Sequence, residues 1–103
     1  MNMSCHKNLL AQIKNLPNEP GVYYFFSDEI KSPLYIGKSI KIRERVKSHL
    51  YHSKVSARES KLMQRVTRID YKLTAGELGA LLLESREIKT HKPLYNRRLR
   101  KVK

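Results

Sequence analysis

Acidic residues are scarce in this chain. Its 103 residues include 9 Asp and Glu against 22 Lys and Arg, which gives a formal net charge of +13. An excess of that size in so short a chain favours a polyanionic partner, and nucleic acid is the partner we expect. A basic surface that serves only solubility is the weaker alternative. The shortage of acids also disfavours a nuclease centre in which several carboxylates hold two metal ions.

Cysteine is limited to one residue, and long apolar runs are missing. Cys5 alone excludes an internal disulfide framework and a zinc site made of several cysteines, and it fits a reducing cytoplasm. No apolar run approaches the length of a membrane span, and the first residues lack the apolar core of a signal peptide. We therefore expect a cytoplasmic protein that forms a single domain over residues 1–103, with a basic tail at 97–103.

Glycine is too sparse around Gly37-Lys38-Ser39 to form a phosphate-binding loop. A Walker A loop needs a glycine five positions before Gly37, and Ser32 occupies that position. The intervening Pro33-Leu34-Tyr35-Ile36 predicts a strand instead of a flexible cradle. Nucleotide hydrolysis is therefore disfavoured.

The apolar pattern predicts the order helix, strand, strand, helix, short helix, strand, helix. The first three elements are a helix over 7–16 after a loose lead at 1–6, and strands over 22–26 and 33–37. The second helix follows Ser39 as N-cap, and the third covers 59–66 after a mobile loop at 53–60. A strand over 68–73 precedes the last helix, which Pro93 ends. Because the order lacks regular βαβ alternation, we predict an α+β fold with a three-stranded antiparallel sheet flanked by helices.

The patterns within these elements predict which side chains turn inward. Ile42, Val46 and Leu50 form an apolar stripe on the second helix, and a stripe of Lys41, Arg45 and His49 borders it. The strand over 68–73 alternates, which turns Ile69, Tyr71 and Leu73 to one face. The last helix begins with a capping box of Thr74 and Glu77. Its predicted buried stripe consists of Leu78, Leu81, Leu82, Ser85 and Ile88.

Titratable groups give few pointers to a catalytic site. His49 and His52 lie three residues apart on one helix, but no acid near them in sequence completes a metal site. Glu84 lies beside the apolar stripe of the last helix, where an acid without a partner would be costly. One such acid with a Mg²⁺ ion, assisted by tyrosines and cations, is permissible chemistry for phosphodiester hydrolysis.

Several motifs together resemble the GIY-YIG nuclease family. They are Gly21-Val22-Tyr23, Tyr35-Ile36-Gly37-Lys38, Arg45, Glu84 and Asn96, in the family's order and at its spacing. The sequence is most similar to the N-terminal nuclease domains of the UvrC and Cho excision-repair endonucleases, and the similarity covers about residues 17–98. It departs from them at two points. Val22 replaces the isoleucine of the family name, and His49 stands where the UvrC group often has tyrosine.

The resemblance implies the same small α+β fold and cleavage of DNA with a single Mg²⁺ or Mn²⁺ ion. It implies that Glu84 anchors the metal and that Tyr23 is the general base or orients the attacking water. An unperturbed phenol has a pKa near 10, so that Lys38, Arg45 and the metal would have to lower the pKa of Tyr23. The candidate catalytic residues are Tyr23, Tyr35, Lys38, Arg45, His49 and Asn96.

The resemblance also bears on the roles of single residues. Asn96 would brace the site through hydrogen bonds, and His49 is left open between proton transfer and phosphate contact. If the rings of Tyr23 and Tyr35 serve only sheet packing, their hydroxyls lie at the rim. If Glu84 holds no metal, it is an acid on the helix surface that pairs with Lys38 or Arg45. Four other tyrosines are expected in the core or at its edge: Tyr24, Tyr51, Tyr71 and Tyr95.

Further basic residues are expected to bind the DNA backbone, so that affinity falls steeply with salt. They are Lys41, Arg43, Lys47, Arg97, Arg98, Arg100 and Lys101. The resemblance implies at most one incision, 3′ of a lesion, with the help of a recruiting protein partner or of additional DNA-binding modules. The alternative is a non-catalytic basic module that binds DNA or RNA on the same scaffold.

Overall fold

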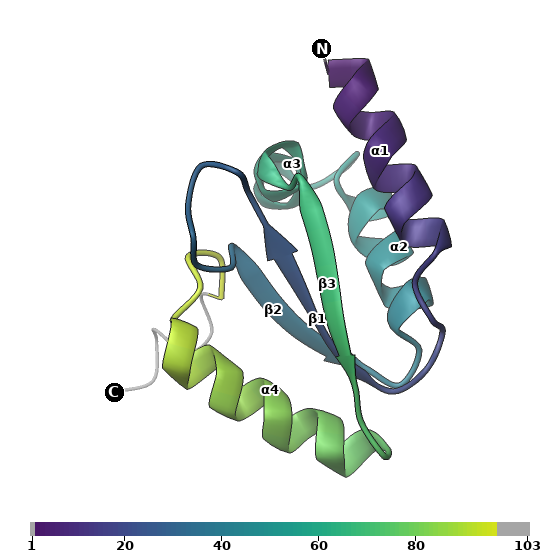
Figure 1. Ribbon diagram of the computed structural model, residues 1–103. Helices are drawn as coiled ribbons and strands as arrows, with labels where there is room; N and C mark the ends of the chain where they lie inside the picture. The colour runs from purple at the N-terminus through teal and green to yellow at the C-terminus, as the bar shows by residue number, and fades with distance from the viewer. Residues whose placement is uncertain (1, 97–103) are drawn as a thin grey trace.

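A three-stranded antiparallel sheet forms the middle of the computed structural model, which describes residues 2–96 (Figure 1). The strands β1 (Gly21–Phe26), β2 (Tyr35–Ser39) and β3 (Arg68–Leu73) lie in the order β2-β1-β3, so that β1 is central. Tyr23 on β1 pairs with Gly37 on β2 and with Tyr71 on β3. The predicted α+β fold with three antiparallel strands is confirmed.

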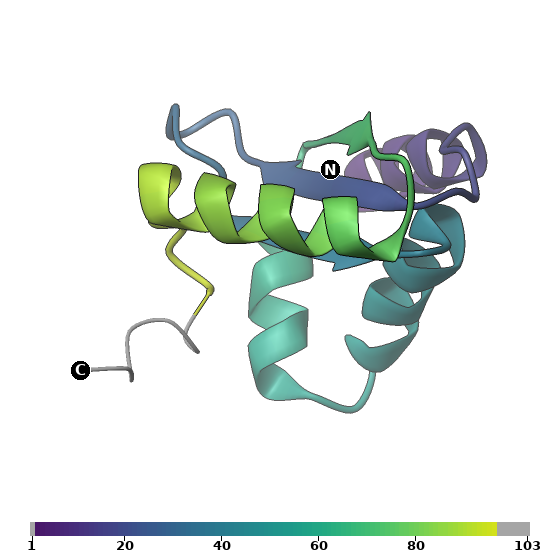
Figure 2. The ribbon, with the colours of Figure 1, turned by 90° about the horizontal axis from the view of Figure 1, so that it is seen from below.

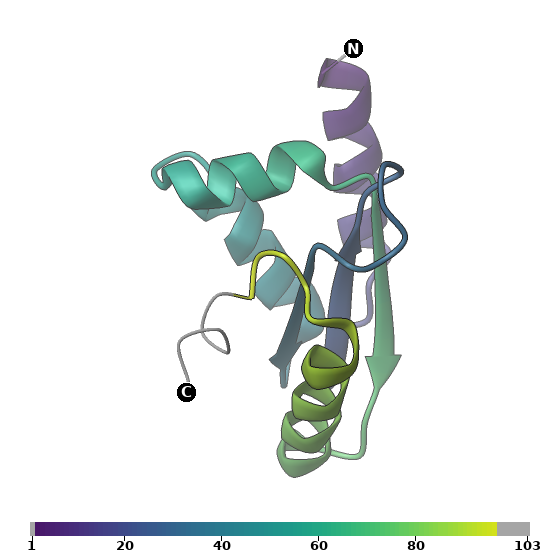
Figure 3. The ribbon, with the colours of Figure 1, turned by 90° about the vertical axis from the view of Figure 1, so that its left-hand side faces the viewer.

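Four helices pack against this sheet: α1 (Asn2–Lys14), α2 (Ile42–His52), α3 (Ala57–Arg65) and α4 (Glu77–His91). Helices α2 and α3 are joined by a short turn and project together from the sheet (Figure 2). They lie on one side of the sheet, away from α4 (Figure 3). None of the helices in the described part of the chain is both long enough and apolar enough to cross a membrane.

The central strand supplies both halves of the core because its side chains alternate between the two faces. Tyr23 and Phe25 are fully buried in the larger cluster, which apolar residues of α1, α2 and α3 complete. Val22 and Tyr24 point the other way and pack with Ile88 of α4. The cluster on the first face therefore holds the Tyr23 ring in a fixed place.

Several predicted boundaries are wrong. Helix α1 begins at Asn2, where a loose lead was expected. Strand β2 extends to Ser39 because its pairing with β1 continues through Gly21↔Ser39. The Ser39 hydroxyl therefore accepts a hydrogen bond from the Lys41 N–H, at 2.9 Å, instead of capping α2.

The segment expected to be a mobile loop contains the start of α3. Helix α3 begins at Ala57, and the hydroxyl of Ser56 caps it by accepting a hydrogen bond from the Glu59 N–H.

The capping box predicted for the last helix is also wrong, because the N-cap of α4 is Gly76 and no side chain caps it. The Thr74 hydroxyl instead donates to the Gly76 carbonyl, at 3.0 Å.

Helix α4 turns a different face to the sheet than its leucines predict. Its buried residues are Ala80, Glu84 and Ile88, whereas Leu78, Leu81 and Leu82 are exposed. A polar contact favours this orientation: the Tyr24 hydroxyl donates to Glu87 Oε1, at 2.9 Å. On β3, similarly, Ile69 is buried while Tyr71 and Leu73 are exposed.

Candidate active site

One cleft with a volume of about 380 Å³ collects side chains from five elements and from the segment after α4. It is called the active-site cleft below. Strands β1 and β2 contribute two tyrosines and a lysine, α2 and α3 contribute an arginine each, and α4 contributes one carboxylate. The lining residues are Tyr23, Tyr35, Lys38, Arg45, Arg58, Glu84, Tyr95 and Asn96.

The two tyrosines meet at the bottom of this cleft. Tyr23 is fully buried, and its ring centroid lies 6.1 Å from that of Tyr35. Tyr23 leans over Gly37, where a Cβ atom would overlap its ring and its hydroxyl. A glycine at this position thus lets the Tyr23 ring lie against the backbone of β2.

Burial raises the pKa of the Tyr23 hydroxyl well above its ordinary value. The Arg45 guanidinium acts in the opposite direction but does not outweigh the burial. Burial also raises the pKa of Tyr35, again against the effect of Arg45. The cations that the protein itself supplies therefore do not offset the effect of burial on the Tyr23 hydroxyl.

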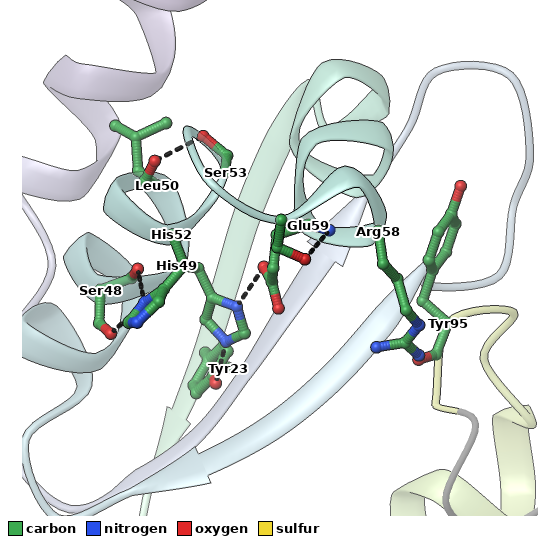
Figure 4. Close-up of polar contacts among 10 residues, drawn as sticks. Tyr23, Ser48, His49, Leu50, His52, Ser53, Arg58, Glu59 and Tyr95 are labelled. Carbon is green, nitrogen blue, oxygen red and sulfur yellow. Dashed lines mark hydrogen bonds and ion pairs between the residues drawn. The ribbon is translucent and has the colours of Figure 1, made fainter.

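Positive charge lines the cleft from three directions. Lys38 lies at the end of β2, Arg45 lies one turn into α2, and Arg58 lies in the first turn of α3. Arg58 Nη2 donates to the backbone carbonyl of Tyr95 (Figure 4). Sequence reasoning missed Arg58 and Tyr95 as cleft residues, because Arg58 falls in the segment expected to be a loop.

Among residues 2–96, Glu84 is the only acid that lines this cleft, and it is buried with 6% of its surface exposed. Its carboxylate is a hard oxygen ligand of the kind that Mg²⁺ and Mn²⁺ prefer. Within residues 2–96, no three His, Cys, Asp or Glu residues gather in a way that could hold a metal ion. A cation at Glu84 would therefore take most of its ligands from water and phosphate, which suits Mg²⁺ because it keeps several waters in most protein sites.

Asn96 ties the segment after α4 to the edge strand of the sheet. Its Oδ1 accepts from the Ile36 N–H at 2.9 Å, and its Nδ2 donates to the Ile36 carbonyl at 2.8 Å. The Tyr95 N–H donates to the Leu34 carbonyl at 2.9 Å and extends this pairing. Both ends of the Asn96 amide therefore bond to the backbone of β2 at Ile36.

His49 does not line the active-site cleft, but it contacts Tyr23, which does. Its Nε2 lies 2.7 Å from the Tyr23 hydroxyl, and its Nδ1 lies 3.0 Å from Glu59 Oε1 (Figure 4). No acid lies near His49 in the sequence, but the fold brings Glu59 of α3 into contact with its imidazole. A sequence signal for Glu59 existed, since Ser56-Ala57-Arg58-Glu59 is a capping-box pattern.

The predicted DNA-binding residues do not all face this cleft. Lys41 is exposed at the start of α2. Arg43 donates to the Leu16 carbonyl at 3.2 Å, and with Lys47 it lines a second cavity of about 830 Å³ between α1 and α2. Four others lie outside the described residues: Arg97, Arg98, Arg100 and Lys101.

Comparison with known proteins gives matches over nearly the whole chain. Residues 19–97 match a family model described as the UvrC-like GIY-YIG domain. Excinuclease Cho of Escherichia coli K12 is 46% identical over 95 residues, which are 92% of this chain and 31% of that protein. UvrABC system protein C of Haloarcula marismortui is 44% identical over 88 residues, which are 84% of this chain and 15% of that protein. The chain thus spans less than a third of the length of these curated relatives.

A solved structure shares the fold. The GIY-YIG N-terminal endonuclease domain of UvrC from Thermotoga maritima, bound to its catalytic divalent cation magnesium, superimposes with a TM-score of 0.75 at 28% identity. The match covers 93% of this chain and 99% of that domain. Point mutants of that domain with tyrosine changed to phenylalanine or asparagine changed to alanine are likewise bound to the catalytic divalent cation.

Proposed function

The chain belongs to the UvrC-like GIY-YIG domain family, and from this premise we propose that it is an endonuclease domain that hydrolyses DNA phosphodiester bonds with one divalent cation. A single observation carries the proposal. Two tyrosines, three cations and one buried carboxylate line the same cleft, although they come from five elements spread over the chain. Sheet packing alone does not require a carboxylate at that place.

The cations of the cleft bind the substrate. Lys38, Arg45 and Arg58 surround a space that suits a phosphodiester, whose non-bridging oxygens carry negative charge. Arg45 stabilises the charge that develops on the phosphate oxygens when water attacks, since its guanidinium is already in position. Lys41 at the start of α2 extends the positive surface along the DNA backbone.

The carboxylate of Glu84 holds the cation, and water molecules complete the coordination. A Mg²⁺ or Mn²⁺ ion held there would supply Lewis-acid stabilisation of negative charge on the phosphate. Glu84 is buried and shares the cleft with three cations, and burial strengthens its electrostatic interactions. This supports Glu84 as the residue on which cleavage depends most.

Tyr23 orients the attacking water and takes part in removing its proton, and Tyr35 lies beside it at the bottom of the cleft. The two hydrogen bonds of Asn96 to the Ile36 backbone fix β2, and with it the positions of Tyr35 and Lys38. Because Tyr23 is fully buried and packed against Gly37, its hydroxyl is held in place before the substrate binds.

The biological substrate is DNA undergoing repair. Two named relatives are excinucleases of the Cho and UvrC types, and from them we infer a single incision 3′ of a lesion. Such an incision requires that a partner protein or a further DNA-binding module deliver the chain to the damage. The cleft itself supplies the chemistry of one strand cleavage and no recognition of a base sequence.

Nicking of supercoiled plasmid tests the proposal. The purified chain should convert it to the relaxed form with Mg²⁺ or Mn²⁺ and leave it intact with EDTA. Glu84→Gln, which removes the charge and keeps the shape, should lower the rate by at least about 100-fold, whereas DNA affinity at fixed salt should change little. Glu77→Gln makes the same chemical change at an exposed position in the first turn of α4 and should nick as wild type does.

Two outcomes would overturn the enzymatic role. One is tight DNA binding without metal-dependent nicking, which would identify the chain as a non-catalytic basic binding module. The other is nicking by Glu84→Gln at the wild-type rate, which would remove Glu84 as the metal ligand and point to a contaminating nuclease.

A further inference from the structure

We propose that Tyr23, His49 and Glu59 form a proton relay in which His49 accepts the proton of Tyr23 and Glu59 positions the imidazole. The proposal rests on the endonuclease activity proposed above, because it describes how Tyr23 becomes able to take a proton from water. It assigns a role to Glu59, which lies outside the active-site cleft, and it decides between the two roles that were open for His49.

The three side chains form one continuous line of hydrogen bonds. The Tyr23 hydroxyl lies 2.7 Å from His49 Nε2, and His49 Nδ1 lies 3.0 Å from Glu59 Oε1 (Figure 4). They come from β1, α2 and α3, so that the line depends on the packing of α2 against α3. His49 is only 4% exposed, and its ring packs edge-on against Tyr23, Phe25 and Tyr35. The imidazole is therefore held in one orientation.

The direction of the bonds follows from the chemistry of the three groups. An ionised carboxylate only accepts hydrogen bonds, so His49 must carry a proton on Nδ1 to bond with Glu59. A neutral imidazole then has a lone pair on Nε2, and the Tyr23 hydroxyl must donate to it. Glu59 thereby selects the tautomer in which His49 can accept the proton of the phenol. This is the same logic by which an acid orients the histidine of a serine protease.

Tyr23 needs such an acceptor. Burial raises the pKa of its hydroxyl well above the ordinary value, and so a standing phenolate is not available at neutral pH. A base in contact with the hydroxyl removes this difficulty, because the proton moves only as it is needed. Tyr23 also lines the active-site cleft, which is where the proposed hydrolysis takes place.

The proton count closes over one turnover. Water gives a proton to the Tyr23 oxygen while the Tyr23 proton passes to Nε2 of His49, and the resulting hydroxide forms the new bond to phosphorus. The sugar oxygen leaves with the electron pair of the broken bond and takes a proton from solvent. His49 is then an imidazolium beside the Glu59 carboxylate, which stabilises its charge. It returns its extra proton to solvent before the next turnover.

A second opening gives that proton a way out. A second cavity of about 310 Å³ is lined by Arg45, Ser48, His49, His52, Ser56 and Glu59. The Glu59 side chain is 23% exposed there. The far end of the relay, at His49 and Glu59, therefore reaches solvent through this cavity.

The tautomer can be measured without any nuclease assay. Long-range proton–nitrogen NMR correlations of the metal-free protein should show His49 neutral at pH 7.5 with its proton on Nδ1. In Glu59→Gln the preference for this tautomer should weaken, because a Gln amide can either donate or accept. A wild-type His49 with its proton on Nε2 would overturn the relay, whatever the nicking assay shows.

Nicking rates test the role in catalysis. Glu59→Gln should lower the rate about 10–100-fold and His49→Gln at least about 100-fold, because general base catalysis contributes that much. Glu44→Gln is the matched control, since Glu44 is an exposed acid in the first turn of α2, and its rate should stay within about twofold of wild type. Circular dichroism confirms that each variant is folded before its rate is compared.

The pH profile separates a relay from a merely structural contact. Burial lowers the pKa of His49 below its ordinary value. The Glu59 carboxylate opposes this effect, whereas Arg45 and His52 add to it. The other titratable groups that face the ring are Tyr23 and Tyr35. The rate should fall on the acid side with a midpoint below the ordinary histidine pKa of about 6.5, because imidazolium accepts no proton. In Glu59→Gln this midpoint should move to lower pH, because the carboxylate that raises the pKa of His49 is gone.

Failure of the relay and failure of the nuclease proposal give different results. If wild type nicks DNA and both variants nick at its rate with an unchanged pH profile, the relay is wrong and His49 is a structural residue. If wild type itself does not nick with Mg²⁺ or Mn²⁺, the nuclease proposal and the relay fail together.

Discussion

Replacing Gly37 by alanine tests the geometry around Tyr23. Gly37 is the partner of Tyr23 across β1 and β2, and an added Cβ atom would overlap the Tyr23 ring and its hydroxyl oxygen. Tyr23 is fully buried and bonded to His49 at 2.7 Å, so its ring cannot move without losing this contact. The added methyl group must therefore displace either the ring or strand β2.

The expected cost follows from these contacts. Overpacking a filled site costs about 1–3 kcal/mol. Pulling the Tyr23 hydroxyl off His49 leaves buried polar atoms without partners, at a further cost of about 1–3 kcal/mol. The two costs overlap, since the ring moves to relieve the clash, and we expect Gly37→Ala to lower the free energy of unfolding by about 2–4 kcal/mol. A displacement of the hydroxyl on the order of 1 Å should also lower the nicking rate about 100-fold.

Urea unfolding followed by far-UV circular dichroism measures the first effect, and plasmid nicking with Mg²⁺ measures the second. Gly79→Ala is the matched control, because its added Cβ meets Thr74 Cβ at 3.3 Å and alanine favours the helix α4. It should change the free energy of unfolding by less than about 1 kcal/mol and leave nicking intact. If Gly37→Ala unfolds within about 0.5 kcal/mol of wild type and nicks at the same rate, Tyr23 is not held as argued.

Two further predictions concern pH and salt. The unfolded chain ionises Tyr23 near pH 10, while burial keeps this hydroxyl protonated in the folded chain, so the free energy of unfolding should fall as pH rises above about 10. Urea unfolding from pH 8 to 11 measures this decrease. In Tyr23→Phe the free energy of unfolding should fall less steeply with pH, by up to about 1.4 kcal/mol per pH unit. An unchanged slope would contradict the burial of the phenol. Replacing four basic tail residues by alanine should reduce the slope of log affinity against log salt concentration by up to about 4. Fluorescence anisotropy with a DNA duplex measures this slope, and an unchanged slope would exclude these residues from the DNA contact. These residues are Arg97, Arg98, Arg100 and Lys101.

Local sequence patterns were sufficient for the sheet. The run from Val22 to Phe26 consists of β-branched and aromatic residues, and both of its faces are covered, so the strand was recognisable without knowing its neighbours. Tyr23, Tyr35, Lys38, Arg45, Glu84 and Asn96 were all named from the family resemblance, and all six line one cleft. Their grouping follows from the fold, whereas their individual roles remain predictions.

Helix orientation was not predictable from hydrophobicity alone. The leucines at 78, 81 and 82 suggested a buried stripe, but α4 places the small Ala80 against the sheet and keeps Glu84 in the cleft. The hydrogen bond between Tyr24 and Glu87 joins residues 63 positions apart, and it helps to fix this face. A periodicity argument cannot include such a contact, because it scores each helix without the surface on which it packs.

The same limit explains why Glu59 was missed. It lies ten positions after His49 and on a different helix, and so its contact with the imidazole depends on the turn between α2 and α3. Two segments carry the capping-box pattern, and the structure uses Ser56 as a side-chain cap but not Thr74. The capping-box pattern at Ser56 predicts the correct start of α3. It also places Glu59 in the first turn of that helix, next to the end of α2.

The central claim is that Glu84 holds the cation on which DNA cleavage depends. Titration of Mn²⁺ into the protein, followed by electron paramagnetic resonance of the free ion, measures this binding directly, and nicking is assayed in the same samples. We predict that wild type binds one Mn²⁺ per chain, that nicking rises with the occupancy of this site, and that Glu84→Gln loses both while Glu77→Gln keeps both. Mn²⁺ binding and nicking by Glu84→Gln at wild-type levels would contradict the claim.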